Sequence, residues 1–185
     1  MIACLGWGSL VWDPRELPVE VQWHPDGPEF PVEFTRVSKG GRLTMVVTNG
    51  APPVIILWSK LSVPSLDDGI EALAEREGVP REGIPHSVGV WSAARCSRHA
   101  EAAIVGEWGI ARGLAAVVWT ALKPGFKHSR GTPLTCKQAL DHLRNLAGAT
   151  ESTLRSTFGA PRRRSAPPTV QRSSVNSDGR RSEEG

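Results

Sequence analysis

The stretch Met1-Ile-Ala-Cys-Leu-Gly-Trp-Gly-Ser-Leu10 decides how the fold begins. Residues 1–5 are apolar, and the run stops at Gly6-Trp7-Gly8-Ser9. A short apolar run that ends at glycines is typical of a buried strand followed by a tight turn. Such glycines let backbone N–H groups approach a ligand closely, so Leu5-Gly6-Trp7-Gly8-Ser9-Leu10 is a candidate cradle for a carboxylate or an oxyanion. The alternative is an ordinary tight turn.

The glycine spacing excludes two common motifs. In a dinucleotide-binding G-x-G-x-x-G motif the third glycine would fall on Val11. A serine-hydrolase elbow needs glycines two residues before and after Ser9, where this chain has Trp7 and Val11.

The next segments predict strands. Residues 13–31 contain five prolines and are expected to form an irregular loop. Apolar residues alternate over 30–34, as in a half-buried strand. The apolar runs Leu43–Val47 and 54–58 are separated by Asn49-Gly50 and a proline pair, so they are expected to form a hairpin.

A helix is predicted from Ser65 to the residue before Gly78. Ser65 is a good N-cap, and Asp68 completes a capping box three residues later. Gly78 and Pro80 are typical of the end of a helix.

Glu77 occupies an apolar position of this helix. At about 100° per residue it falls in line with Leu66, Ile70 and Leu73, whereas Arg76 is expected to point elsewhere. A buried carboxyl resists ionisation and can then exchange protons near neutral pH, so Glu77 is a candidate general acid and base. The alternative is a glutamate in the last turn that reaches solvent.

The remaining elements complete a mixed α+β pattern. Strands are expected at 86–93 and 115–122, and helices at 98–111 and 135–147. The element order predicts a mixed sheet or small barrel flanked by helices, in one domain over residues 1–158. Residues 159–185, rich in Arg, Ser and Pro, are expected to form a disordered basic tail.

Composition indicates a soluble cytoplasmic protein. The chain is 39% hydrophobic and 22% charged, and its formal charge of +3 comes from the tail, so a nucleic-acid partner is not expected. Three cysteines at no recognisable spacing favour a reducing compartment. We find no signal peptide and no apolar run of about 18 residues, so no membrane association is expected.

Several other residues have two possible readings. Cys96-Ser-Arg-His99 lacks the second pair of ligands of a zinc site, and no metal is expected. The seven tryptophans could stack on bases, but their spacing favours core packing. Arg36 could bind a carboxylate or lie solvated at a strand end.

Three stretches together resemble the γ-glutamylcyclotransferase family, including its glutathione-degrading branch. Trp7-Gly8-Ser9-Leu10-Val11-Trp12 is similar to the family's Tyr-Gly-Ser-Leu-x-Trp after the first strand. Glu77-Gly78-Val79 is similar to its Glu-Gly-Val after a leucine-containing helix. Phe34-Thr35-Arg36, followed by Gly41-Arg42-Leu43-Thr44, resembles its arginine-bearing second strand and the next one. The likeness covers roughly residues 2–93.

The resemblance implies a small mixed β-barrel with flanking helices and a cavity at its mouth. It implies a lyase or acyltransferase that releases 5-oxoproline from a γ-glutamyl dipeptide, glutathione or amine, without a cofactor. Glu77 would be the acid and base. The implied substrate-binding residues are Leu5, Gly6, Trp7, Gly8, Ser9, Leu10 and Arg36.

One position departs from the family pattern. The family's tyrosine is replaced by Trp7, whose indole donates a hydrogen bond but cannot accept one. Two alternatives to the cyclotransferase therefore stay open: a non-catalytic small-molecule binding module on the same fold, or a related enzyme acting on a γ-glutamylamine.

Overall fold

The computed structural model describes the backbone of residues 1–158 and the side chains of residues 1–149. Contacts divide the chain into two units, Met1–Gly148 and Ala149–Gly185, and every sheet belongs to the first unit. The predicted tail, 159–185, lies outside the described residues. The expected α+β class is confirmed, because the described residues form five helices and several small sheets.

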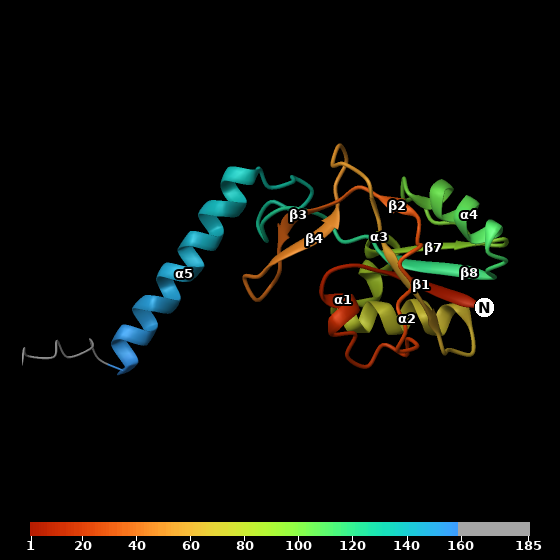
Figure 1. Ribbon diagram of the computed structural model, residues 1–185, viewed down its shortest axis with the longest axis horizontal. Coiled ribbons are helices and arrows are strands. Elements are labelled where there is room, and N and C mark those ends of the chain that lie inside the picture. Colours follow the sequence, from red (N-terminus) through yellow and green to blue (C-terminus); the bar gives the residue numbers. More distant parts are fainter. Residues whose placement is uncertain (159–185) are drawn as a thin grey trace, which may run out of the picture. The chain divides into compact units, whose positions relative to one another are not determined.

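The chain alternates short strands with helices (Figure 1). The strands are β1 (Ile2–Gly6), β2 (Glu29–Phe30), β3 (Val32–Val37), β4 (Leu43–Val47), β5 (Val54–Ile55), β6 (Leu57–Leu61), β7 (Val88–Ser92) and β8 (Ala116–Thr120). The helices are α1 (Ser9–Trp12), α2 (Leu66–Glu77), α3 (Ile84–Ser87), α4 (Ala102–Ala111) and α5 (Cys136–Phe158), with a 3₁₀ turn η1 (Arg81–Gly83). None of the helices within residues 1–158 is both long and apolar enough to cross a membrane.

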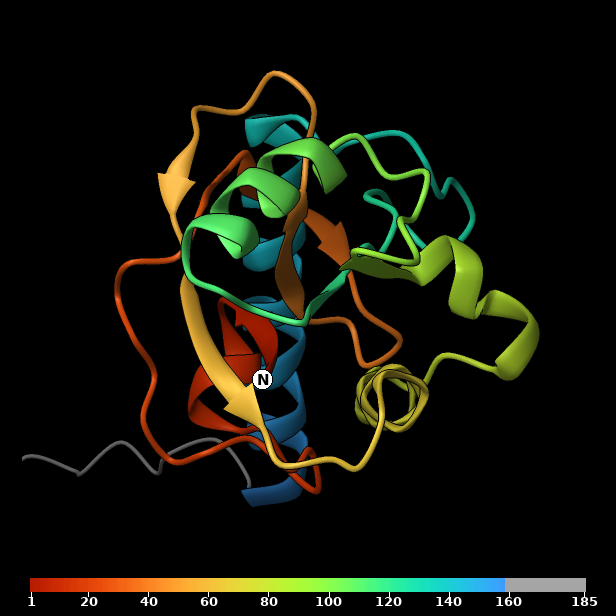
Figure 2. The same ribbon diagram turned by 90° about the vertical axis from the view of Figure 1, so that its right-hand side faces the viewer.

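The central sheet has the strand order β6-β1-β8-β7. Strand β1 pairs parallel with β8 and antiparallel with β6, which places β1 in the interior of the sheet. Helices α2 and α4 lie on opposite faces of this sheet (Figure 2). Because side chains alternate along a strand, Ala3 and Leu5 pack on the α4 side and Cys4 packs on the α2 side. A strand that is covered on both faces has to be apolar throughout, as residues 2–5 are.

The hairpin predicted around Asn49-Gly50 is wrong. Strand β4 pairs with β3, and β5 pairs with β2, so the runs on either side of Asn49-Gly50 belong to different sheets. A turn does form here, since Gly50 has φ 85° and the Ala51 N–H donates to Thr48 O. Pro52 and Pro53 have no N–H to donate, so the ladder cannot continue after the turn.

The alternation predicted over residues 30–34 holds only in part. Phe30 and Val32 are buried, but Phe34 is 48% exposed. The pairing of β3 with β4 shifts register between Glu33 and Arg36, as at a β-bulge. An extra residue in one strand reverses which side chains face inward, and this exposes Phe34.

Helix α2 begins and ends where the sequence predicted. The Ser65 hydroxyl accepts from the backbone N–H of Asp68 at 3.2 Å. Gly78 follows the last turn with φ 63° and donates to Ala74 O and Glu75 O. Since φ is positive there, glycine avoids the strain that a side chain would bring. These two caps fix the position of Glu77 as the last residue of the helix.

Candidate functional site

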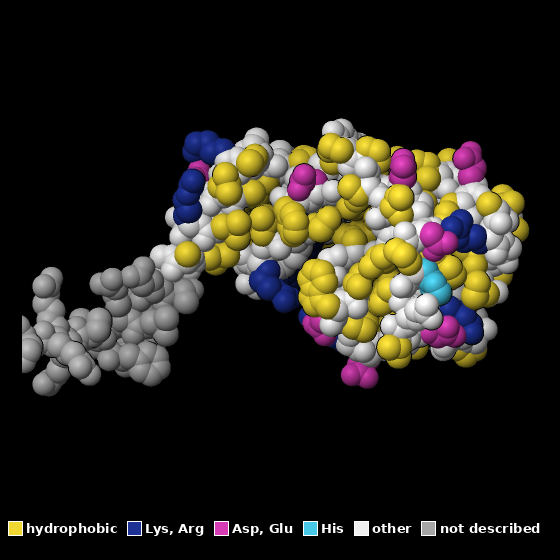
Figure 3. Space-filling model, viewed as in Figure 1, with side chains coloured by type: hydrophobic (Ala, Val, Ile, Leu, Met, Phe, Trp, Pro, Cys, Tyr) yellow, Lys and Arg dark blue, Asp and Glu magenta, His cyan; other side chains and the backbone are white. Residues whose placement is uncertain are grey.

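A cavity of about 590 Å³ lies within the first unit. Its walls come from the turn after β1, the C-terminal end of α2, the β3–β4 hairpin and the segment after β8. Figure 3 shows the surface hollowed between the β3–β4 hairpin and α1. A hollow of this size suits a small molecule.

The turn Trp7-Gly8-Ser9-Leu10, called the glycine turn below, lines the cavity. Gly8 adopts φ 54° and ψ −141°, a combination that essentially only glycine tolerates, and a Cβ there would meet nothing within 4 Å. Within the described residues, the backbone N–H groups of Gly8 and Ser9 have no acceptor. Two adjacent free N–H groups at a cavity wall can hold a carbonyl oxygen or an anion.

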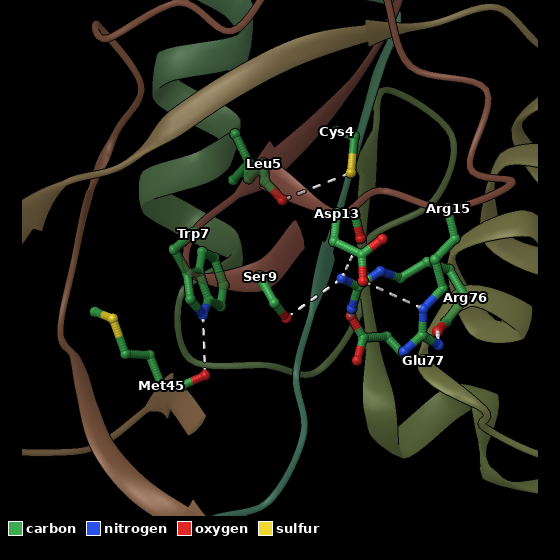
Figure 4. A network of polar contacts seen from close by, with 9 residues as sticks. All are labelled: Cys4, Leu5, Trp7, Ser9, Asp13, Arg15, Met45, Arg76 and Glu77. Atoms are coloured by element: carbon green, nitrogen blue, oxygen red, sulfur yellow. Dashed lines mark hydrogen bonds and ion pairs between the residues drawn. The ribbon is translucent and has the colours of Figure 1, made fainter. Parts of the chain in front are cut away.

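Trp7 ties the glycine turn to the β3–β4 hairpin. Its indole Nε1 donates to the backbone oxygen of Met45 in β4 at 3.2 Å (Figure 4). The ring also packs against Phe30, with centroids 5.7 Å apart. The indole N–H is therefore already hydrogen-bonded within the protein, and the face of the ring packs as part of the cavity wall.

Glu77 lies at the same cavity, with its side chain 13% exposed. Its Oε1 accepts from Arg76 Nη1 at 2.7 Å. Its Oε2 has no hydrogen-bond partner within the described part of the chain. One oxygen is thus fixed by the protein, and the other is available to a ligand.

The helical spacing of Arg76 predicted the wrong direction for its side chain. It was expected to point elsewhere than the apolar line of α2, yet its side chain is only 7% exposed and turns toward the glycine turn. Nη2 donates to Ser9 Oγ at 3.3 Å and to Asp13 O at 2.8 Å (Figure 4). A long flexible side chain can leave the direction of its own Cα–Cβ bond, so helical spacing did not predict this contact.

Arg76 lines the cavity, and Cys4 lies behind the lining in the core on the α2 side of the sheet. Burial and the charge of Glu77 raise the pKa of the Cys4 thiol from 9.0 to about 12, although Arg76 acts in the opposite direction. The Cys4 thiol is therefore a neutral, apolar support at neutral pH. Its Sγ lies 3.6 Å from the backbone oxygen of Leu5.

Arg36 lies on the hairpin side of the cavity, beside a second arginine that the sequence did not indicate. Arg36 Nη1 donates to Lys123 O at 2.6 Å. Arg130 donates through Nη1 to Gly125 O and through Nη2 to Val37 O, the latter at 2.8 Å. Burial, together with the charge of Arg130, lowers the pKa of Arg36, and burial lowers the pKa of Arg130.

The lining of the cavity is strongly basic. Glu77 is the one acidic residue among the described residues that line it. The basic residues of the lining are Arg15, Arg36, Lys39, Arg42, Arg76, Lys123 and Arg130. An excess of positive charge around a partly closed hollow favours an anionic ligand.

Two of the residues expected to bind a substrate do not line the cavity. Leu5 is fully buried in the core between the sheet and α4. Gly6 ends β1 opposite Leu57, and a Cβ on it would overlap the ring of Trp23. Both position the glycine turn from behind, whereas Trp7, Gly8, Ser9, Leu10, Arg36 and Glu77 all line the cavity.

The part of the chain with described side chains contains no group of three His, Cys, Asp or Glu residues that could hold a metal ion.

Comparison with known proteins finds no relative of this chain. No protein-family model, no curated protein and no solved structure gives a significant match to this chain.

Proposed function

We propose that the chain is a γ-glutamylcyclotransferase-like enzyme that releases 5-oxoproline from a γ-glutamyl compound. One observation carries the proposal: the free carboxylate oxygen of Glu77 and the free N–H groups of Gly8 and Ser9 belong to the lining of one cavity. A base and an oxyanion-binding pair in one hollow are the two elements that an intramolecular acyl transfer needs.

The reaction proceeds by intramolecular attack. Glu77 Oε2 takes a proton from the α-ammonium of the γ-glutamyl group, and the freed amine attacks the γ-carbonyl carbon. A five-membered ring closes as the new C–N bond forms, which is favoured because both groups belong to one molecule. The N–H groups of Gly8 and Ser9 stabilise the negative charge that develops on the carbonyl oxygen.

Breakdown of this intermediate completes the cycle. The original amide C–N bond breaks as Glu77 returns the proton to the leaving nitrogen, and the ring nitrogen gives up its second proton, so that the amine departs protonated. The products are 5-oxoproline and a free amine, so the atoms balance without water, a metal or a redox cofactor.

The proposal includes the finer architecture of a small mixed barrel with flanking helices. Bridges between the separate sheets support it. Arg36 in β3 pairs with Gly125 in the segment that follows β8, and Val19 and His24 pair with residues of β6. Such bridges connect the central sheet with the β3–β4 hairpin and extend its β6 edge.

A second function has its own support. Arg76 holds Glu77 Oε1, and basic residues dominate the cavity, as in a site that binds a small anion without transforming it. A non-catalytic binding module would bind γ-glutamyl compounds and leave them intact. A third possibility, an enzyme for γ-glutamylamines, differs from the first in its substrate.

The test is direct measurement of product. The purified chain is incubated with a γ-glutamyl dipeptide, with glutathione and with a γ-glutamylamine, and 5-oxoproline is quantified by mass spectrometry. We expect turnover that Glu77→Gln lowers by roughly a hundredfold or more, since a carboxamide cannot exchange the proton. Glu75→Gln is the matched control, because Glu75 is an exposed residue of the same helix and does not line the cavity.

The outcomes separate the three functions. Product from the peptides supports the first, and product from the amine alone supports the third. Binding by calorimetry without product supports the binding module and contradicts the enzyme. Equal loss in Glu75→Gln and Glu77→Gln would also contradict the assigned role of Glu77.

A further inference from the structure

We propose that Arg130, beside Arg36, binds a carboxylate on the leaving half of the substrate and is a specificity-determining residue. This inference rests on the proposed function and narrows its substrate class. It predicts that the site prefers γ-glutamyl peptides with a free terminal carboxylate over γ-glutamylamines, which lack that group.

The segment after β8 brings the two arginines together. Gly125 bridges to Arg36, and its N–H donates to Thr35 O at 2.7 Å, so the segment runs along β3. Gly125 has φ 99°, and a Cβ there would overlap the backbone oxygens of Ser129 and Thr132. The tight loop that Gly125 permits folds Arg130 back onto the carbonyl groups of Gly125 and Val37.

The two guanidinium groups are not neutralised by an ion pair in the described part of the chain. Within the described residues neither Arg36 nor Arg130 forms a salt bridge, and each is partly buried. Adjacent like charges in a partly buried site repel each other and cost free energy. A bound anion would remove this cost, and a bidentate carboxylate fits the planar fork of an arginine.

The hydrogen bonds that the arginines make leave most of their donors unused. A guanidinium has five N–H groups. Arg36 donates to one backbone oxygen and Arg130 to two, so most donors of both side chains remain for a ligand. The carbonyl contacts hold each fork in place without neutralising its charge, as pre-organised anion-binding residues require.

The position of the pair suits the leaving half of a substrate. Arg36, Arg130 and Glu77 all line the one cavity, and Arg36 interacts electrostatically with both of the others. With the α-ammonium at Glu77 and the γ-carbonyl at Gly8 and Ser9, the rest of the substrate extends along the lining toward Arg130. A terminal carboxylate there meets two cations.

The experiment compares two substrates that differ in one group, γ-glutamylglycine and γ-glutamylglycinamide. Their kcat/KM values are measured for the wild-type chain, Arg130→Gln, Arg130→Lys and the control Lys127→Gln. Lys127 is exposed on the same loop, outside the cavity lining, and its change removes the same charge. The wild type should prefer the carboxylate substrate by roughly tenfold or more.

Arg130→Gln should bring that preference close to unity by slowing the carboxylate substrate alone. Arg130→Lys should keep part of the preference, and Lys127→Gln all of it. If Arg130 had only a structural role, Arg130→Gln would slow both substrates equally, which would overturn the inference. Equal kcat/KM values for the two substrates in the wild type would also overturn it, while leaving the proposed function intact.

Binding keeps the inference testable if neither compound turns over, a result that contradicts the proposed function. Calorimetry then compares the affinities of the two compounds for the wild type and for Arg130→Gln. A carboxylate preference of roughly tenfold that disappears in Arg130→Gln supports the anion subsite. Equal affinities overturn it.

Discussion

Arg76 donates to the carboxylate of its neighbour Glu77 across 2.7 Å and, from the same guanidinium, to Asp13 O at 2.8 Å. This group therefore joins the end of α2 to the segment that follows the glycine turn. The orientation of Glu77 depends on a contact with a part of the chain that precedes α2 by about fifty residues. Arg76 is a positioning residue in the proposed reaction, since it acts through Glu77.

Replacing Arg76 by Met should destabilise the fold. The change keeps an apolar stem but leaves Ser9 Oγ, Asp13 O and Glu77 Oε1 without their donor. Removal of one partner from a largely buried pair costs about 3 kcal/mol, measured as a lower free energy of unfolding in urea. Arg81→Met is the control, because the Arg81–Glu71 pair is 87% and 59% exposed and should change stability by less than about 1 kcal/mol. Similar losses in both variants would contradict the role of Arg76.

Replacing Gly8 by Ala should strain the glycine turn. Steric overlap is not the cause of this strain, since a Cβ on Gly8 would meet nothing within 4 Å. The backbone angles of Gly8 are unfavourable for any side chain and should cost about 1–3 kcal/mol, seen as a lower melting temperature. Gly148→Ala is an opposite control, because Gly148 lies in α5 with open space and alanine favours a helix. A neutral Gly8→Ala would show that the turn adopts another conformation.

Gly89 should not tolerate alanine. Gly89 in β7 lies opposite Trp119 in β8, and a Cβ on Gly89 would overlap the fully buried indole ring. Overpacking of this kind costs about 1–3 kcal/mol or more. The diagnostic measurement is a double-mutant cycle with Trp119→Leu. We expect the two losses to be non-additive, with the double variant more stable than the sum predicts by about 1 kcal/mol or more. Additive losses would mean that the two side chains do not share this space.

The buried thiol of Cys4 should make stability fall at alkaline pH. Folding raises its pKa from 9.0 to about 12, so between these values the unfolded chain releases a proton that the folded chain retains. The unfolded state then binds fewer protons, and stability declines as pH rises, by about 1 kcal/mol per pH unit. The chain has no tyrosine that would titrate in the same range.

The measurement is urea unfolding between pH 8 and 10.5 under reducing conditions. Cys4→Ala should flatten the decline, whereas Cys96→Ala should leave it unchanged because Cys96 is exposed. The same steep decline in Cys4→Ala would assign the effect to other groups.

The burial of Cys4 can also be tested by chemical modification. In the folded protein, a thiol reagent should modify Cys96 and Cys136 and leave Cys4 unmodified.

The sequence predicted those elements that short-range rules control. The helix from Leu66 to Glu77 was correct at both ends because capping by Ser65 and Gly78 depends on residues within a single turn. The first strand followed from a continuous apolar run. Spacing along the helix put Glu77 in line with the apolar residues but left open whether its side chain would reach solvent, and the structure shows that side chain to be mostly buried.

The errors arise where partners distant in the chain decide. The runs beside Asn49-Gly50 pair with β3 and β2, a choice that depends on which strands are free at the sheet edges.

Other errors concern very short helices. No element was predicted at Ser9–Trp12, and the short helix α3 occupies the start of the strand expected at 86–93. Helices this short carry too few residues for periodicity to be visible.

The sequence by itself determined the glycine turn, the capped helix and the carboxylate at its end, because each depends on the conformational preferences of neighbouring residues. The tertiary structure alone decided that this carboxylate is held by Arg76 and that Arg130 joins Arg36 at one basic cavity. Arg130 and Val37, which it contacts, are 93 residues apart in the chain. Contacts over such separations result from the packing of the whole unit, and no local pattern encodes them.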